Sequence, residues 1–199
     1  MEAKAGIPAD LLRNRNVPAF LEAYFELNHL KQLYRQGWLR RGLPKERCES
    51  VAEHTFGVVM LAYLLAEVRS PELDTGRVLR LALLHDIGEI FAGDIVPADG
   101  MPAEDKHHLE RQAVEQVFGS LPNGERFLAL WDEYEQGSTA EALFVHQIDR
   151  LEMAFQASIY ALQGMLDPAE FFASARLALN DPILAGLEQA AEAVTLDEP

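Results

Sequence analysis

The chain has little with which to build disulfides, membrane anchors or an export signal. Its 199 residues include one cysteine, Cys48, which has no partner for an internal disulfide and therefore fits a reducing compartment. No stretch approaches the roughly 18 consecutive apolar residues of a membrane span. Residues 1–10 carry acidic residues and lysine without the apolar core of a secretory signal. We therefore expect a cytoplasmic protein without a membrane partner.

Basic residues are also scarce. Lysine and arginine number 17 against 32 aspartates and glutamates, which gives a formal net charge of −15. Because a nucleic-acid backbone is bound by clustered Lys and Arg, this balance argues against a nucleic-acid surface. A small phosphorylated ligand remains compatible, since it needs only one or two local cations, or a metal ion that reverses the negative field.

Strand-like alternation is missing as well, while apolar residues recur at spacings of three and four along nearly the whole chain. Caps and breakers divide the chain into expected helices, which run from Pro18 to just before Gly37 and over 51–68, 75–91, 102–118, 126–134 and about 139–163. Capping boxes at Ser50 with Glu53 and at Ser138 with Glu141 mark two of the starts, and Gly93 ends the helix over 75–91. Two further helices are expected after the Asp-Pro pairs at 167–168 and 181–182. An irregular connector is expected over 38–47, and Met60, Met153 and Phe155 are expected in the core. The pattern predicts one all-α domain over 1–199, a compact helical bundle over about 17–163 followed by two C-terminal helices over about 168–195.

Two side chains of metal-ligand type stand next to each other in the apolar segment Leu83–Glu89. They are His85 and Asp86, and an ionised aspartate buried there without a partner would cost several kcal/mol. Glu89 follows His85 by four residues, which in a continuous helix places the two on one face. The local pattern leaves open whether this is a metal or catalytic site or a salt-bridged helix end.

Two further candidates lie on other predicted helices. His54 is in the first turn of the helix over 51–68, and Asp149 is in the middle of the last long helix. Each could instead have a purely structural role. His54 could be a hydrogen-bonded histidine of the core, and Asp149 could be an exposed carboxylate beside Arg150. With His85 and Asp86 they supply two imidazoles and two carboxylates, a set suited to Mn, Fe, Co, Zn or Mg with positions left for water and substrate.

The order His54, His85 with Asp86, and Asp149 resembles the signature of HD-domain metal-dependent phosphohydrolases. Five longer segments resemble their 5′-deoxynucleotidase group: Arg35–Trp38, Glu49–His54, His85–Glu89, Gly93–Asp99 and Trp131–Glu135. The resemblance covers about residues 20–160. It implies an HD-domain helical bundle, commonly a homodimer, that uses a divalent metal ion to hydrolyse 2′-deoxyribonucleoside 5′-monophosphates to deoxynucleoside and phosphate.

The resemblance also implies a role for each matching residue. His54, His85, Asp86 and Asp149 would hold the metal ion, and Glu89 would handle the proton of the attacking water. Arg35 would orient the phosphate and Trp38 would help to select deoxyribose. Asp94, counted with Glu89 as catalytic, begins the segment Asp94, Ile95, Val96 and Pro97, which would lie against the nucleotide. In some relatives Glu89, Asp94 and the Ile95 carbonyl are positioned for a second metal ion.

Two alternative functions stay open at this point. One is an HD hydrolase for another nucleotide phosphoester, such as a triphosphate, a cyclic dinucleotide or an alarmone. The other is a non-catalytic nucleotide-binding HD module, against which the presence of Glu89 argues. The connector between Trp38 and His54 is about two residues longer than in close relatives. His146 stands where relatives often carry lysine, and is either a phosphate contact or a partly exposed helix residue. Lys106 is a possible phosphate contact, whereas His107 and His108 are expected on a solvated face.

Overall fold

The computed structural model describes residues 2–96 and 99–196. The α-helices are α1 (Ala19–Leu27), α2 (Gln36–Arg40), α3 (Val51–Arg69), α4 (Thr75–Leu84), α5 (Glu89–Ala92), α6 (Ala103–Phe118), α7 (Glu125–Gln136), α8 (Ala140–Leu162), α9 (Ala169–Ala178) and α10 (Pro182–Leu196), with short 3-10 helices η1 (Pro8–Leu12), η2 (Asn28–Lys31) and η3 (Lys45–Arg47). Within the described residues, β pairing is limited to two isolated bridges, Ala3 with Leu33 and Tyr34 with Ser50. The predicted all-α fold class is confirmed.

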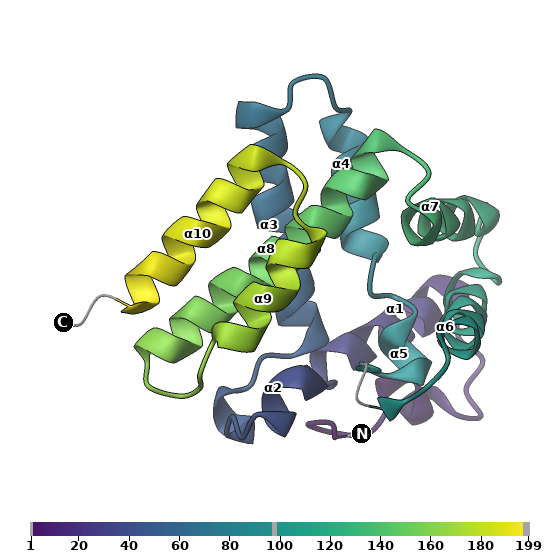
Figure 1. The fold of residues 1–199 in the computed structure, drawn as a ribbon. Helices are drawn as coiled ribbons and strands as arrows, with labels where there is room; N and C mark the ends of the chain where they lie inside the picture. Colours follow the sequence, from purple (N-terminus) through teal and green to yellow (C-terminus); the bar gives the residue numbers. More distant parts are fainter. Residues whose placement is uncertain (1, 97–98, 197–199) are drawn as a thin grey trace.

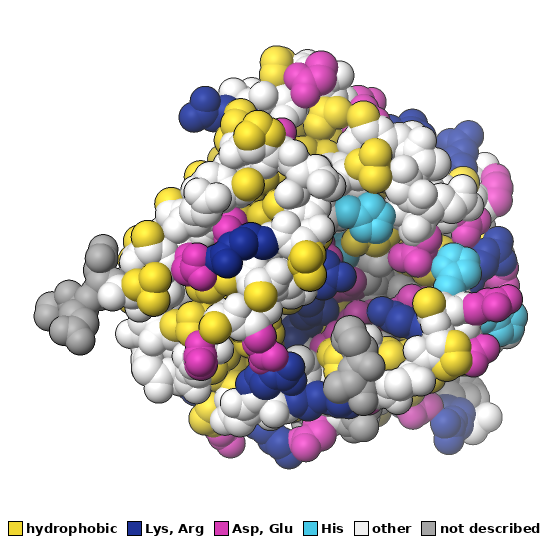
Figure 2. Space-filling view, in the orientation of Figure 1, with side chains coloured by type: hydrophobic (Ala, Val, Ile, Leu, Met, Phe, Trp, Pro, Cys, Tyr) yellow, Lys and Arg dark blue, Asp and Glu magenta, His cyan; other side chains and the backbone are white. Residues whose placement is uncertain are grey.

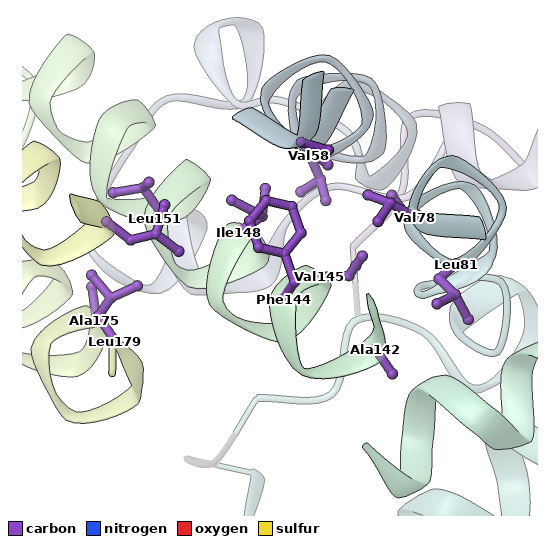
Figure 3. Close-up of a cluster of buried hydrophobic side chains, with 14 of the residues drawn as sticks. Val58, Val78, Leu81, Ala142, Phe144, Val145, Ile148, Leu151, Ala175 and Leu179 are labelled. Atoms are coloured by element: carbon purple, nitrogen blue, oxygen red, sulfur yellow. The ribbon is translucent and has the colours of Figure 1, made fainter. Parts of the chain in front are cut away.

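Helix α8 runs through the middle of the molecule (Figure 1). It packs against α3 and α4 on one side and against α9 and α10 on the other, while α1, α5, α6 and α7 form the remaining part of the bundle. The largest apolar cluster lies where α3, α4 and α8 meet, and Figure 3 shows Val58, Val78 and Ile148 from these helices pointing toward one another. All three are fully buried.

A second apolar cluster joins the start of α3 and the end of α4 to α5, α6 and α7. It contains Val51, Leu84 and Trp131, whereas Val58 and Leu81, further from this end of the same two helices, belong to the largest cluster. Residue 54 on α3 lies between Val51 of the second cluster and Val58 of the largest, and residue 85 directly follows Leu84 of the second cluster. His54 and His85 are two of the expected metal ligands.

Helix α3 begins at the predicted capping box. The Ser50 hydroxyl accepts a hydrogen bond from the Glu53 amide at 3.3 Å, and the Glu53 carboxylate accepts one from the Ser50 amide at 2.7 Å. The helix has 19 residues and contains an 18-residue window with a mean hydropathy of 1.4, so by length and composition it qualifies as a membrane span, contrary to the expectation from sequence. Here it is a core helix packed against α4 and α8. Met60, expected in the core, is exposed on it.

The helix expected from Pro18 to Gly37 is broken. Helix α1 ends at Leu27, and Gly37 lies inside the separate short helix α2. The reason is a pairing with a distant segment, in which the Val51 amide donates to the Leu33 carbonyl at 2.9 Å and the Arg35 amide donates to the Glu49 carbonyl at 3.1 Å. These bonds satisfy backbone groups that a continuous helix would have used internally.

The helix expected over 75–91 is also interrupted, at the histidine–aspartate pair. Helix α4 ends at Leu84, residues 85–88 form a turn, and α5 starts at Glu89. Helix α6 approaches this turn so closely that a Cβ on Gly88 would lie 2.6 Å from the Glu110 Cβ. At the start of α8, the N-cap is Thr139 rather than Ser138, since the Thr139 hydroxyl accepts from the Ala142 amide at 3.2 Å.

Candidate metal and phosphate site

Three elements bring the predicted metal-ligand side chains together. His54 comes from α3, His85 and Asp86 from the turn after α4, and Asp149 from α8. The ligand atoms of His54, His85 and Asp149 all lie within 4.8 Å of one another. The His54 Nε2 is 3.1 Å from the Asp149 Oδ1, 3.4 Å from the His85 Nε2 and 3.6 Å from the Asp86 Oδ2. Residues that are far apart in the sequence thus form one cluster.

Both imidazoles present Nε2 to this cluster because Nδ1 is engaged elsewhere. The Nδ1–H of His85 donates to the Ala82 carbonyl at 2.8 Å, one turn earlier on α4. The Nδ1–H of His54 donates to the Glu152 carboxylate at 2.6 Å. A histidine that binds a metal through one nitrogen characteristically donates the other N–H to a carbonyl or carboxylate, so the orientation fits metal ligands.

The state of the carboxylates fits a divalent ion as well. Burial opposes ionisation of Asp86 and Asp149. The charge and hydrogen bond of His85 outweigh burial at Asp86, and those of His54 outweigh it at Asp149, so both pKa values lie below the usual range. The Asp86 Oδ2 is buried and lies 3.2 Å from the His85 Nε2. The cluster thus offers two ionised carboxylates and two imidazole Nε2 atoms. This donor set is suited to Mn, Co, Mg, Fe or Zn.

The two histidines are surrounded by negative charge. Burial and the Arg35 charge disfavour protonation of His54, yet its bonds to Asp149 and Glu152 prevail and raise its pKa to about 10. Burial likewise opposes protonation of His85, and the adjacent Asp86 raises the His85 pKa nonetheless. Because metal ligands must be deprotonated, ion binding at this cluster would release protons.

A second group of polar side chains adjoins the first. The Arg35 Nη1 lies 3.3 Å from the Asp94 Oδ1, 3.7 Å from the Asp86 Oδ2 and 3.9 Å from the Glu89 Oε1. Asp94 also accepts a hydrogen bond from the Gln36 amide. Gly93, with a φ of +81°, permits the turn between α5 and Asp94 that many side chains would resist.

Glu89 is the most strongly perturbed carboxyl of this second group. Its burial and the neighbouring charges of Asp86 and Asp94 raise its pKa well above the ordinary value, although Arg35 acts in the opposite direction. Its Oε2 is buried and makes no hydrogen bond within the described part of the chain. A buried carboxyl with a raised pKa beside a metal-ligand cluster is suited to exchange protons with a bound substrate.

Figure 2 shows charged and histidine side chains gathered around a hollow on the face between α8 and α6. The Lys106 Nζ on α6 lies 3.4 Å from the Glu110 Oε1. Burial lowers the pKa of Lys106, but the charges of Glu110 and Glu89 outweigh burial and raise this pKa above its ordinary value. His107 and His108 are exposed on α6, as expected, and the His107 ring also stacks on Trp131. His146 is half-buried and stacks on Tyr134.

Trp38 lies apart from this cluster. Its ring is buried against Tyr160 and Phe171, and its indole N–H donates to the Glu49 Oε1 at 2.7 Å. Ile95 and Val96 are half-buried after Asp94, whereas Pro97 lies outside the described residues. The contacts of Trp38 indicate a packing role, and selection of deoxyribose by Trp38 stays a prediction.

The chain is similar to a defined set of proteins. A model of the HD domain matches residues 27–189. The human 5′-deoxynucleotidase HDDC2 is 42% identical over 136 residues, which cover 67% of this chain and 64% of the human protein. The mouse 5′-deoxynucleotidase HDDC2 is 40% identical over 160 residues, which cover 79% and 73%. The matched region thus spans just under two thirds of the human relative.

Solved structures with the same arrangement include two relevant relatives. The crystal structure of the PH0347 protein from Pyrococcus horikoshii OT3 superposes with a TM-score of 0.72 at 30% identity, covering 88% of this chain and 98% of that one. The crystal structure of a predicted metal-dependent phosphohydrolase from Magnetospirillum magnetotacticum MS-1 gives a TM-score of 0.68 at 32% identity, covering 89% and 92%.

Proposed function

The chain belongs to the HD-domain family, and from this premise we propose that it is a metal-dependent phosphomonoesterase that hydrolyses 2′-deoxyribonucleoside 5′-monophosphates. The observation that carries the proposal is the convergence of His54, His85 and Asp149 within 4.8 Å, beside the carboxyl of Glu89 and the guanidinium of Arg35. The substrate class is that of the curated relatives, and the dependence on a metal is supported by the donor set.

His54, His85, Asp86 and Asp149 would hold the catalytic ion. When bound, a divalent ion lowers the pKa of a coordinated water and offsets the charge of phosphate oxygens. The mixture of imidazole and carboxylate donors accommodates Mn, Co, Mg, Fe or Zn. We extend the proposal to a second ion near Glu89, Asp94 and the Ile95 carbonyl, since Glu89 and Asp94 together place two carboxylates around Arg35.

Arg35 is the residue best placed to hold the phosphate. Burial opposes the charge, but four carboxylates, led by Asp94, outweigh it and raise the Arg35 pKa well above the ordinary value, so the guanidinium is a cation at every physiological pH. Its planar group can bind two phosphate oxygens at once. Because Nη1 lies 3.7 Å from Asp86, a phosphate held by Arg35 would also border the metal-ligand cluster.

Glu89 would manage the proton. In the hydrolysis, the oxygen of water bonds to phosphorus, the bond from phosphorus to the 5′-oxygen breaks, and a proton passes from the water to the leaving 5′-oxygen. Burial keeps the pKa of Glu89 high enough for its carboxyl to hold that proton between the two oxygens. Asp94, hydrogen-bonded by the Gln36 amide and by Arg35, fixes the position of the guanidinium.

The physical setting is part of the proposal. A net charge of −15 suits free nucleotides as substrates rather than nucleic acid. We further propose a cytoplasmic location, which the single cysteine supports, and a homodimer, which the resemblance to the deoxynucleotidase group implies. Light scattering on the purified protein tests the assembly state, with a monomer at working concentration as the contradicting result.

The decisive experiment measures phosphate release from ribo- and deoxyribonucleoside monophosphates by metal-stripped protein. Mg, Mn, Co and Zn are added back separately, and His85→Ala is the control. We expect release from the deoxy monophosphates that is lost in His85→Ala. No release from any monophosphate with any of the metals would contradict the proposal. Tripolyphosphate from a triphosphate, cleavage of a cyclic dinucleotide or alarmone, or binding without turnover would then identify the alternative.

A further inference from the structure

The two imidazoles of the metal-ligand cluster are held from behind by different kinds of acceptor. The Nδ1–H of His85 donates to a backbone carbonyl, that of Ala82, at 2.8 Å. The Nδ1–H of His54 donates to a buried carboxylate, that of Glu152, at the shorter distance of 2.6 Å. A carbonyl orients an imidazole, whereas an ionised carboxylate also increases the electron density that the opposite nitrogen can donate.

We propose that Glu152 is a positioning residue that fixes His54 as a metal ligand. Its carboxylate accepts the Nδ1 proton, selects the tautomer that offers Nε2 to the ion, and strengthens Nε2 as a donor. Glu152 follows Asp149 by one turn of α8, so the same helix supplies one ligand and the group behind another. This inference rests on the proposed function, because it concerns affinity for the metal ion.

Gly57 makes the approach of Glu152 possible. It lies one turn after His54 on α3, and a Cβ at this position would be 2.9 Å from the Glu152 Cδ and still closer to Oε1. Real Cβ atoms essentially never approach other heavy atoms so closely. Any side chain at position 57 would therefore displace the carboxylate from His54.

The displaced carboxylate would have somewhere to go. A cavity of about 690 Å³ is lined by Glu49, Gly57 and Glu152 among others, and by none of the four expected metal ligands. The atoms that clash belong to the end of a flexible side chain rather than to backbone. Alanine at position 57 can consequently be accommodated by moving Glu152 while the helices keep their packing.

Glu49 and Trp38 complete the support behind His54. Acidic oxygens of Glu49 and Glu152 and a ring nitrogen of His54 all lie within 4.8 Å of one another. The Trp38 N–H donates to Glu49 at 2.7 Å, which holds that carboxyl in place beside Glu152. The buried Trp38 thus contributes to the site through Glu49.

The test measures Co²⁺ affinity calorimetrically with metal-stripped full-length protein in the absence of substrate. Glu152→Ala and Gly57→Ala are compared with Gly186→Ala, a matched control on α10 where a Cβ would meet nothing within 4 Å. Loss of such a support typically weakens metal binding about 10- to 100-fold. We expect losses of this size for Glu152→Ala and Gly57→Ala, and unchanged affinity for Gly186→Ala. Thermal unfolding of each metal-stripped variant verifies that it is folded.

The double variant separates positioning from general disturbance. If Gly57→Ala acts by displacing Glu152, it has no further effect on Co²⁺ affinity in the Glu152→Ala background. Wild-type affinity in Glu152→Ala, or a full additional loss in the double variant, would overturn the inference. A wild-type protein that binds Co²⁺ but releases no phosphate from any monophosphate would contradict the proposed function and leave this result standing.

Discussion

The Arg35 Nη1 lies 3.3 Å from the Asp94 Oδ1, although the two residues are separated by 59 positions in the sequence. The backbone pairing of residues 33–35 with 49–51 holds Arg35 at this place, and the turn at Gly93 brings Asp94 to it. The guanidinium is therefore oriented by the fold before any phosphate arrives, which reduces the ordering that substrate binding requires.

We expect Arg35→Lys to lower kcat/KM for a deoxyribonucleoside monophosphate about 10- to 100-fold, mainly through KM. A charge-assisted hydrogen bond contributes about 1.5–3 kcal/mol, and an ammonium cannot reproduce the planar two-point contact. Steady-state kinetics measures the change. Arg40→Lys is the control, since Arg40 is exposed and pairs with Asp99 on the surface. Equal losses in both variants would remove Arg35 from phosphate binding.

Glu89→Gln is expected to lower turnover at least about 100-fold, the usual contribution of a positioned acid or base. Affinity for Co²⁺ at the site of His54, His85, Asp86 and Asp149 should stay close to wild type, because these four expected ligands are untouched. Phosphate release and calorimetric titration on the same preparation give the two quantities. A turnover number near that of wild type would exclude Glu89 from proton transfer.

Removal of the metal ion should lower the thermal stability of the wild type. An ion present at 100 times its Kd stabilises the folded state by about 2.7 kcal/mol, which corresponds to roughly 5–10 °C in Tm for a chain of this size. Chelation followed by back-titration, monitored by calorimetry, measures this shift. His85→Ala should show no metal-dependent shift, and a shift equal to that of wild type would place the ion elsewhere.

Glu110 should make stability depend on pH. Burial, opposed by the charge of Lys106, raises its folded-state pKa to about 7, whereas the unfolded value is about 4.3. When the pKa of a carboxyl is higher in the folded than in the unfolded state, the group does not reduce the free energy of unfolding at pH values below the unfolded-state pKa. At pH values above the folded-state pKa it reduces the free energy of unfolding by the full amount. The stability of Glu110→Gln relative to wild type should therefore increase by about 3 kcal/mol between pH 4 and pH 8.

Denaturant unfolding at several pH values measures this difference for Glu110→Gln. Glu104→Gln is the matched control, because Glu104 lies exposed in the first turn of the same helix. A pH-independent difference for Glu110→Gln would show that the Glu110 carboxyl ionises normally in the folded protein.

Cys48 is expected to resist thiol reagents in the native protein. Burial, followed by the charges of Glu49 and Asp94, raises its pKa to about 12, so the reactive thiolate is rare at pH 8. A disulfide exchange reagent should label Cys48 slowly in buffer and rapidly in denaturant. Equally fast labelling in both solutions would contradict the buried position.

Signals confined to a few neighbouring residues could be predicted from the sequence. The capping box at Ser50 and Glu53 was one, and the cap at Asp181, which accepts from the Ile183 amide at 2.7 Å, was another. The breaks after Leu27 and Leu84 could not be predicted, because distant segments cause them. Residues 49–51 pair with 33–35 in the first case, and α6 approaches Gly88 in the second.

The candidate site divides in the same way. Residue types and a family resemblance were enough to select His54, His85, Asp86 and Asp149. They could not indicate which ring nitrogen faces the cluster, since the acceptor for His54 stands 98 positions away on α8. The one available signal for Glu152 was its spacing of one helical turn from Asp149. The burial of Trp38 was likewise not predictable, because Tyr160 and Phe171 come from the far end of the chain.

Two ligands of the metal-ligand cluster, His54 and Asp149, are 95 positions apart in the chain. An ion bound to both would act as a reversible cross-link that closes a long loop, and such links restrict the open states available to the chain. Metal supply would then set the lifetime of the folded protein as well as its activity. Cells depleted of the ion would lose the enzyme itself by proteolysis of opened chains, in addition to losing its turnover.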